Sequence, residues 1–119
     1  MAKNILKDKS YAFALKIVEV YRNLQMEKEF VLSKQVLRSG TSIGALINEA
    51  EFGYSKADFT YKMSLALKEA NETQYWLTLL KDSGYISNEL FTNLLAPIKE
   101  IIALLVASLK TAKRNITKR

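Results

Sequence analysis

Apolar residues recur every three or four positions through the middle of the chain. The members of this seam are Phe59, Met63, Ala66, Ala70, Thr73, Leu77 and Leu80. Alternating steps of four and three keep one face of a helix apolar along its whole length, as in antiparallel bundles. Such a face has to be covered by other helices, so the seam predicts a helical bundle. We expect residues 56–83 to form its longest helix, capped at the start by Ser55.

Three other stretches show helical apolar spacing. The first runs from about residue 8 to residue 24, with Asp8 or Ser10 as its N-cap, and the second from about residue 33 to residue 51. The last follows Ser87, its expected cap, and contains Pro97, which predicts a bend over residues 93–97. The predicted fold class is therefore all-α, an antiparallel up-down four-helix bundle.

The second predicted helix contains an ambiguous segment at residues 39–42. Its sequence, Ser-Gly-Thr-Ser, is locally typical of a loop, and a break there would divide the bundle into five shorter pieces. The alternative is a continuous helix in which Gly40 and Gly44 permit close approach of a neighbour. A phosphate-binding loop is disfavoured because the Gly-Lys-Ser/Thr ending is missing.

Composition narrows the function classes. The 119 residues form a single domain, 1–119, with 49% hydrophobic residues, four glycines and one proline. Cysteine and histidine are absent, which excludes disulfides, thiolate catalysis, Ser-His-Asp sites and zinc sites built on Cys and His. We therefore expect a protein that is not an enzyme and carries no cofactor.

The charged first twenty residues predict no signal peptide. The longest apolar run, residues 101–107, is too short to span a bilayer, so a soluble cytoplasmic protein is expected.

Positive charge collects at the C-terminal end. The net charge is +6, and residues 110–119 contribute five basic side chains and no acid. We expect this segment to be a flexible basic tail beyond the last helix. It is the predicted nucleic-acid site, through Lys110, Lys113, Arg114, Lys118 and Arg119, with Arg38 as a weaker candidate.

The helix at residues 56–83 has a second apolar face opposite the seam. We predict an oligomer interface there, because tryptophan and tyrosine anchor many interfaces. Its members are Tyr61, Leu65, Lys68, Glu72, Tyr75, Trp76 and Leu79. Two alternatives stay open: Tyr75 and Trp76 wrap onto helices of the same chain, or Glu69, Glu72, Asp58 and Glu49 form a carboxylate magnesium site. Ion pairs with Lys62 and Lys68 explain the same acids, so no metal is expected.

Four segments of the chain together resemble one protein family. They are Arg38-Ser39-Gly40-Thr41-Ser42-Ile43-Gly44-Ala45, Glu49-Ala50, Ser55-Lys56-x-Asp58-Phe59 and Lys68-Glu69-Ala70-x-Glu72-Thr73-x-Tyr75-Trp76-Leu77. The family comprises the four-helix-bundle proteins encoded in intervening sequences of bacterial 23S rRNA genes, often labelled ribosomal-like. The likeness covers roughly residues 7–109. Leu46 stands where the family often has asparagine, so any function of that asparagine is not implied here.

The resemblance implies an up-down bundle whose second helix is continuous through Gly40, and a homopentamer arranged as a ring or barrel. It implies no enzymatic activity. A related protein, the accessory protein of diversity-generating retroelements, is a basic pentamer that binds nucleic acid and a reverse transcriptase, which makes both of these implied partners. We therefore expect an oligomeric bundle that binds RNA or single-stranded nucleic acid through basic surface. A protein–protein assembly or adaptor module with no nucleic-acid role is the alternative.

Overall fold

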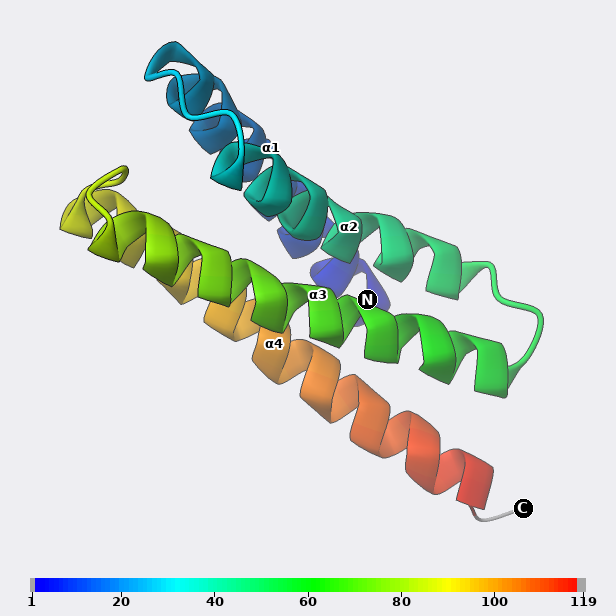
Figure 1. The fold of residues 1–119 in the computed structure, drawn as a ribbon. Helices are drawn as coiled ribbons and strands as arrows, with labels where there is room; N and C mark the ends of the chain where they lie inside the picture. The colour runs from blue at the N-terminus through cyan, green and yellow to red at the C-terminus, as the bar shows by residue number, and fades with distance from the viewer. Residues whose placement is uncertain (1, 118–119) are drawn as a thin grey trace.

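The structure is a computed structural model that describes residues 2–117, with side chains placed for residues 5–115. It contains four helices: α1 (Ala2–Met26), α2 (Leu32–Glu51), α3 (Lys56–Asp82) and α4 (Asn88–Thr117). Within the described range there is no strand, and the helices run up and down along a body of 52 × 22 × 22 Å (Figure 1). The predicted all-α four-helix bundle is confirmed.

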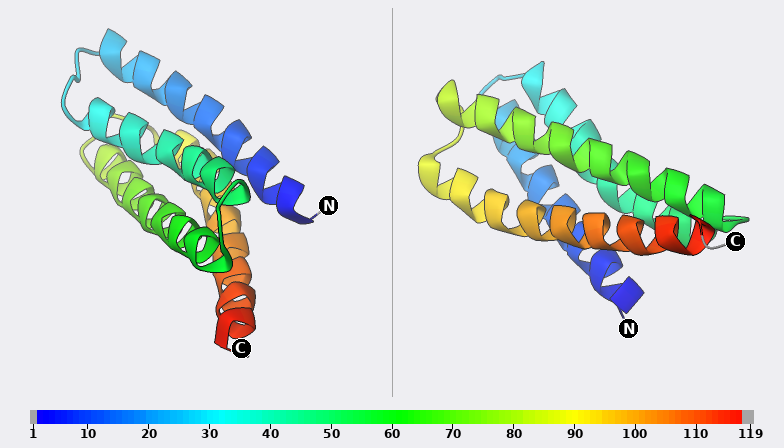
Figure 2. Two further views of the ribbon diagram at one scale, coloured as in Figure 1. Left: turned by 90° about the vertical axis from the view of Figure 1, so that its right-hand side faces the viewer. Right: turned by 90° about the horizontal axis from the view of Figure 1, so that it is seen from below.

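Each helix packs against the helices before and after it in the chain. The contact is most extensive between α2 and α3 and least extensive between α1 and α4, which close the ring of four. The connections α1–α2 and α3–α4 lie at one end of the bundle, and the α2–α3 connection lies at the other end with the start of α1 and the end of α4 (Figure 1). We call this second end the open end, because α1 and α4 diverge there (Figure 2).

The core contains the predicted seam of α3. Met63, Ala66, Ala70, Thr73, Leu77 and Leu80 are buried, and Phe59 is half-buried against the core. Buried side chains of the other helices complete the core, among them Phe13 and Ile17 of α1. The periodicity therefore predicted the buried face of α3 correctly.

The predicted start of α1 and the prediction that α3 is the longest helix are both wrong. Helix α1 begins at Ala2 rather than near Asp8, because Leu6 extends the buried stripe by another turn. Asp8 and Ser10 are consequently not caps: they lie within the helix, and the buried Ser10 hydroxyl donates to the Lys7 carbonyl at 3.0 Å. Helix α4, with 30 residues, is longer than α3, with 27.

The predicted caps of the other helices are confirmed. The Ser55 hydroxyl accepts a hydrogen bond from the Asp58 N–H at 3.0 Å, and Ser87 accepts one from the Leu90 N–H at 3.0 Å. Helix α4 runs without interruption through Pro97, so the bend near that residue remains a prediction.

Helix α2 is continuous through residues 39–42, so the loop interpretation is wrong and the continuous alternative is confirmed. The hydroxyls of Thr41 and Ser42 donate back to carbonyls one turn earlier, at 2.7 and 2.5 Å, so these residues are satisfied inside a helix. The buried Ser39 hydroxyl is hydrogen-bonded to that of Thr73 at 2.9 Å, which ties α2 to α3.

Gly40 allows α2 to approach α1 closely. A Cβ atom at this position would lie 2.8 Å from Cγ1 and 2.9 Å from Cγ2 of Ile17, whereas one at Gly44 would lie 3.4 Å from the Ser10 hydroxyl oxygen. Both distances at position 40 are too short for a real Cβ atom, whereas the distance at position 44 is not. The packing therefore requires glycine at position 40 and tolerates alanine at position 44.

A buried glutamate caps the N-terminus of α2. The Glu29 carboxylate is 8% exposed and accepts hydrogen bonds from the N–H groups of Val31, Leu32 and Ser33, at 3.2, 3.0 and 2.6 Å. Burial would raise the pKa of Glu29, but these donors together lower it below its usual value.

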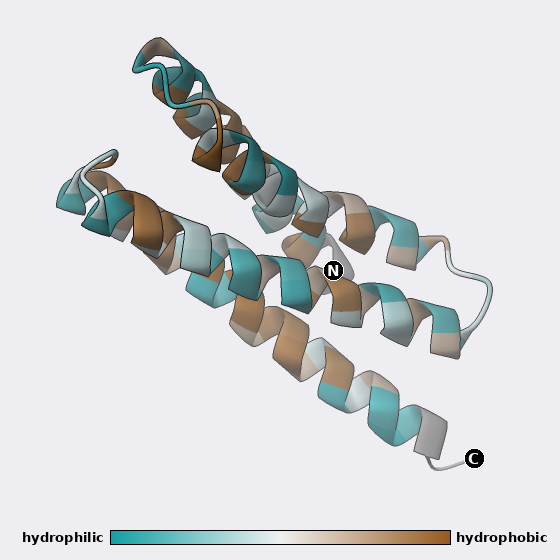
Figure 3. Cartoon of the chain, in the orientation of Figure 1, coloured by the Kyte–Doolittle hydropathy of each residue, from teal (hydrophilic) through white to brown (hydrophobic). Residues whose placement is uncertain are grey.

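Helix α4 is the most apolar of the four (Figure 3). By length and composition alone its residues 88–115 could span a membrane. Leu94, Ile98, Ile101 and Leu105 are buried in the core, so the bundle accounts for the apolar stripe that they form.

Candidate functional site

The basic segment of the chain is helical as far as the structure describes it. Helix α4 continues to Thr117, so residues 110–117 lie within the last helix and not beyond it, where the sequence had predicted the basic tail. The apolar stripe of α4 ends at the buried Leu109, which packs into the core just before the last turns of the helix. Of the predicted nucleic-acid residues, Lys118 and Arg119 lie outside the described residues.

The helix arranges the remaining three basic residues as a stripe. Lys110, Lys113 and Arg114 are exposed and are separated by steps of three and one, so they lie on one side of the last turns of α4. We call these three residues the basic stripe. The sequence contains no acid after Glu100, so the last turns of α4 carry only positive charges of their own.

Arg38 lies elsewhere, in the middle of α2. Its guanidinium pairs with Glu69 at 3.0 Å and with Glu72, both on α3. These carboxylates neutralise the charge of Arg38 and would repel a phosphate. The structure therefore separates Arg38 from the basic stripe and gives it a role in joining α2 to α3.

The predicted interface on α3 divides into two groups. Tyr61 and Tyr75 are each 60% exposed, and Lys68 is exposed as well. The half-buried members are Leu65, Glu72, Trp76 and Leu79. Trp76 packs against the core of its own chain, as the alternative interpretation expected, and its ring meets that of Tyr75 edge-on with centroids 5.1 Å apart.

The hydrogen-bond partners of Glu72 do not include Lys68. It accepts hydrogen bonds from the Trp76 indole N–H, at 2.9 Å, and from Arg38. The Trp76 hydrogen bond is the largest cause that lowers the pKa of Glu72, and the Arg38 charge adds to it against the effect of burial. Arg38, Glu69, Glu72 and Trp76 therefore form a hydrogen-bonded network, and the charge of Lys68 makes a smaller contribution to the lowered pKa of Glu72.

Three of the four acids considered for magnesium form ion pairs: Glu49, Glu69 and Glu72. Lys62 pairs with Glu49 at 2.9 Å, and this hydrogen bond raises the pKa of Lys62. Among residues 5–115 no three acidic side chains come close enough together to hold a metal ion.

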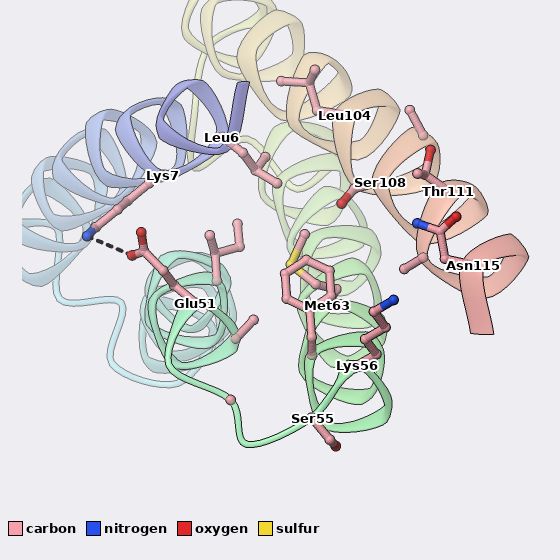
Figure 4. Close-up of a pocket in the computed structure, with 16 residues that line it drawn as sticks. Leu6, Lys7, Glu51, Ser55, Lys56, Met63, Leu104, Ser108, Thr111 and Asn115 are labelled. Carbon is pink, nitrogen blue, oxygen red and sulfur yellow. Dashed lines mark hydrogen bonds and ion pairs between the residues drawn. The ribbon is translucent and has the colours of Figure 1, made fainter. Parts of the chain in front are cut away.

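The sequence did not indicate a cavity of about 740 Å³ at the open end. All four helices contribute to it, and Figure 4 shows Leu6, Met63 and Leu104 around it from three of them. Lys7, Glu51, Lys56 and Asn115 add polar groups. No local pattern predicts such a cavity, because its walls come from residues far apart in sequence.

The sequence from residue 2 to residue 107 matches the model of a family described as 23S rRNA-intervening sequence protein. No curated protein matches the chain. A similar solved structure is that of a protein with unknown function from the S23 ribosomal protein family of Bacteroides thetaiotaomicron. The two sequences are 52% identical over 92% of this chain and 99% of that chain, and the TM-score is 0.90.

Proposed function

The chain belongs to the 23S rRNA-intervening sequence protein family, as its resemblance predicted, and from this premise we propose that it is a non-enzymatic, oligomeric helical bundle that binds RNA. The basic stripe at the end of α4 is the proposed contact surface. The bound chemistry is the phosphate backbone of single-stranded RNA, with little preference for base sequence.

One observation carries this proposal: the helical geometry of the basic stripe. Lys110, Lys113 and Arg114 project from one side of α4. Basic side chains held on one side of a helix can follow neighbouring phosphates, and each contact releases condensed counterions. The affinity that results is steeply dependent on salt.

Oligomerisation would multiply this charge. In a cyclic oligomer the equivalent ends of α4 lie at equal heights, so several basic stripes face one ligand. The family resemblance suggests five copies. The exposed Tyr61 and Tyr75 on α3 support an interface, because large aromatic side chains exposed on one helix are typical anchors.

The first test compares RNA binding by two variants that lose equal charge. In the first, Lys110, Lys113 and Arg114 are replaced by glutamine, and in the second the exposed Lys16, Lys34 and Lys99 are replaced. Binding of a fluorescein-labelled single-stranded RNA of mixed sequence is measured by anisotropy at several salt concentrations. We expect the first variant to bind about tenfold more weakly and to lower the log–log salt slope by about two for each chain engaged.

The control variant should bind like the unmodified protein. Equal weakening of both variants would mean that total charge, and no particular surface, attracts RNA. Failure of the unmodified protein to bind at low salt would remove the RNA proposal, and the adaptor alternative would take its place.

The second test concerns the oligomer. Light scattering on a chromatography column should give a mass of several times the 13.5 kDa of one chain. Replacing Tyr61 and Tyr75 together by alanine should weaken association by about 2 kcal/mol or more, which shows as a lower mass on dilution. Tyr11→Ala removes an equally exposed tyrosine from α1 and should leave the mass unchanged.

Tyrosines are better probes here than Trp76. The indole packs within its own chain and donates to Glu72, so Trp76→Ala would also alter the fold of each copy. A mass of 13.5 kDa for the unmodified protein at micromolar concentration would contradict the oligomer.

A further inference from the structure

The cavity at the open end is long and mostly apolar. Its walls include Leu6 of α1, Ile47 of α2, Phe59 and Met63 of α3, and Leu104 of α4. On α4 its lining extends from Leu104 to Asn115, roughly 16 Å along the helix. A volume of about 740 Å³ lies within the range of roughly 300–1,000 Å³ that small-molecule sites occupy.

Small residues and diverging helices create this space. Ala50, Gly53, Ala107 and Ala112 line it, and none of these side chains is large enough to fill it. Helices α1 and α4 share the least contact of any neighbouring pair, and Figure 2 shows them separating toward this end. An apolar surface of this extent gains free energy when an apolar molecule covers it.

The rim of the cavity carries a lysine without an acidic partner. Lys7 is paired with Glu51 at 3.0 Å, whereas no acid pairs with Lys56 among the residues whose side chains the structure describes. Figure 4 shows Lys56 extending from α3 toward the last turns of α4, on the side of the cavity where Asn115 lies. Since Glu51 is engaged by Lys7, the Lys56 ammonium is the rim group that can pair with a bound anion.

We propose that the open end of the bundle binds a long-chain carboxylate. The alkyl chain inserts between the four helices against Leu6, Phe59, Met63 and Leu104, and the carboxylate pairs with the Lys56 ammonium at the rim. A flexible chain can follow the elongated space between the diverging helices, and its single negative charge complements Lys56. This site is independent of RNA binding, since it depends on the cavity and not on the basic stripe.

Methionine methyl groups can report on this site directly. Met63 lines the cavity, and Met26 is 81% exposed at the opposite end of the bundle. We would label the methionine methyl groups with carbon-13, assign Met63 with the Met63→Leu variant, and add octanoate, decanoate or dodecanoate below micelle formation. The Met63 signal should shift and saturate while the Met26 signal stays in place. Each added pair of methylenes should tighten binding up to about tenfold.

Two pairs of variants separate the charge from the cavity. Lys56→Glu should weaken dodecanoate binding at least tenfold and favour dodecyltrimethylammonium, whereas Lys34→Glu, on exposed surface of α2, should do neither. Ser108→Phe projects into the cavity and should abolish binding, whereas Ala103→Phe, on the exposed side of α4, should not. Circular dichroism checks that all four variants are folded.

Several results would overturn the proposal. One is a Met63 signal that does not respond to dodecanoate, the result expected if side chains of a neighbouring copy fill the cavity. Others are equal shifts of Met26 and Met63, equal affinity for the carboxylate and the ammonium amphiphile, or unchanged binding by Ser108→Phe. None of these results bears on RNA binding, which the variants of the basic stripe test separately.

Discussion

Replacing Phe13 by alanine is expected to lower the free energy of unfolding by about 3–5 kcal/mol, the usual cost of removing a buried aromatic ring. Phe13 is 1% exposed and belongs to the central core cluster. The loss combines the transfer of the ring with the cavity left behind, since the neighbouring helices can relax only in part. Urea unfolding followed by circular dichroism at one protein concentration measures the change.

The matched control for Phe13 is Tyr11, two residues earlier on the opposite side of α1. Its ring is 66% exposed, so Tyr11→Ala should change stability by no more than about 0.5 kcal/mol. Similar losses from the two substitutions would show that α1 does not pack against the bundle through the face described here.

Removal of the Glu29 carboxylate should have the second-largest effect. Glu29→Ala is expected to cost about 2–3 kcal/mol, because three backbone N–H groups at the start of α2 lose a charged acceptor. Glu27→Ala, at an exposed position in the same connection, should cost far less. The same urea unfolding experiment compares the two variants.

Glu29 also makes stability depend on pH in a predictable direction. Its pKa is lowered in the folded protein, so the unfolded chain binds more protons near and below the ordinary glutamate pKa of 4.5. The stabilisation by Glu29 is therefore complete above that pKa and is lost as the pH falls through the lower folded value. Glu29→Gln should remove this part of the acid dependence, and an unchanged pH profile would contradict the assigned cap.

The fold could be predicted from the sequence because its signals are local. The seam of α3 repeats within a single helix, and Ser55 and Ser87 each cap a helix that begins at the next residue. Errors arose where tertiary packing overrides local preference. Residues 39–42 are typical of a loop, yet contact with Ile17 and Thr73 holds them in a helix.

The candidate site was less predictable because its partners are distant in sequence. The sequence groups Arg38 with the other basic residues, and only the structure shows that it pairs with acids of α3. The helical spacing puts Trp76 on an outer face of α3, but its ring is half-buried against the core of its own chain. The cavity depends on how the four helices diverge, and the spacing of apolar residues within a single helix does not predict that divergence.

The packing of every helix on its neighbours in the chain has a consequence for how quickly the protein folds. The connections at residues 27–31, 52–55 and 83–87 are short, so three of the four helix pairs form without closing a long loop. Mean sequence separation between contacting residues is therefore low, and folding within microseconds to milliseconds is the usual behaviour of such topologies. Only the pairing of α1 with α4 joins opposite ends of the chain. That pairing is the step with the largest entropic cost and the smallest contact, and we expect it to form last and to open first.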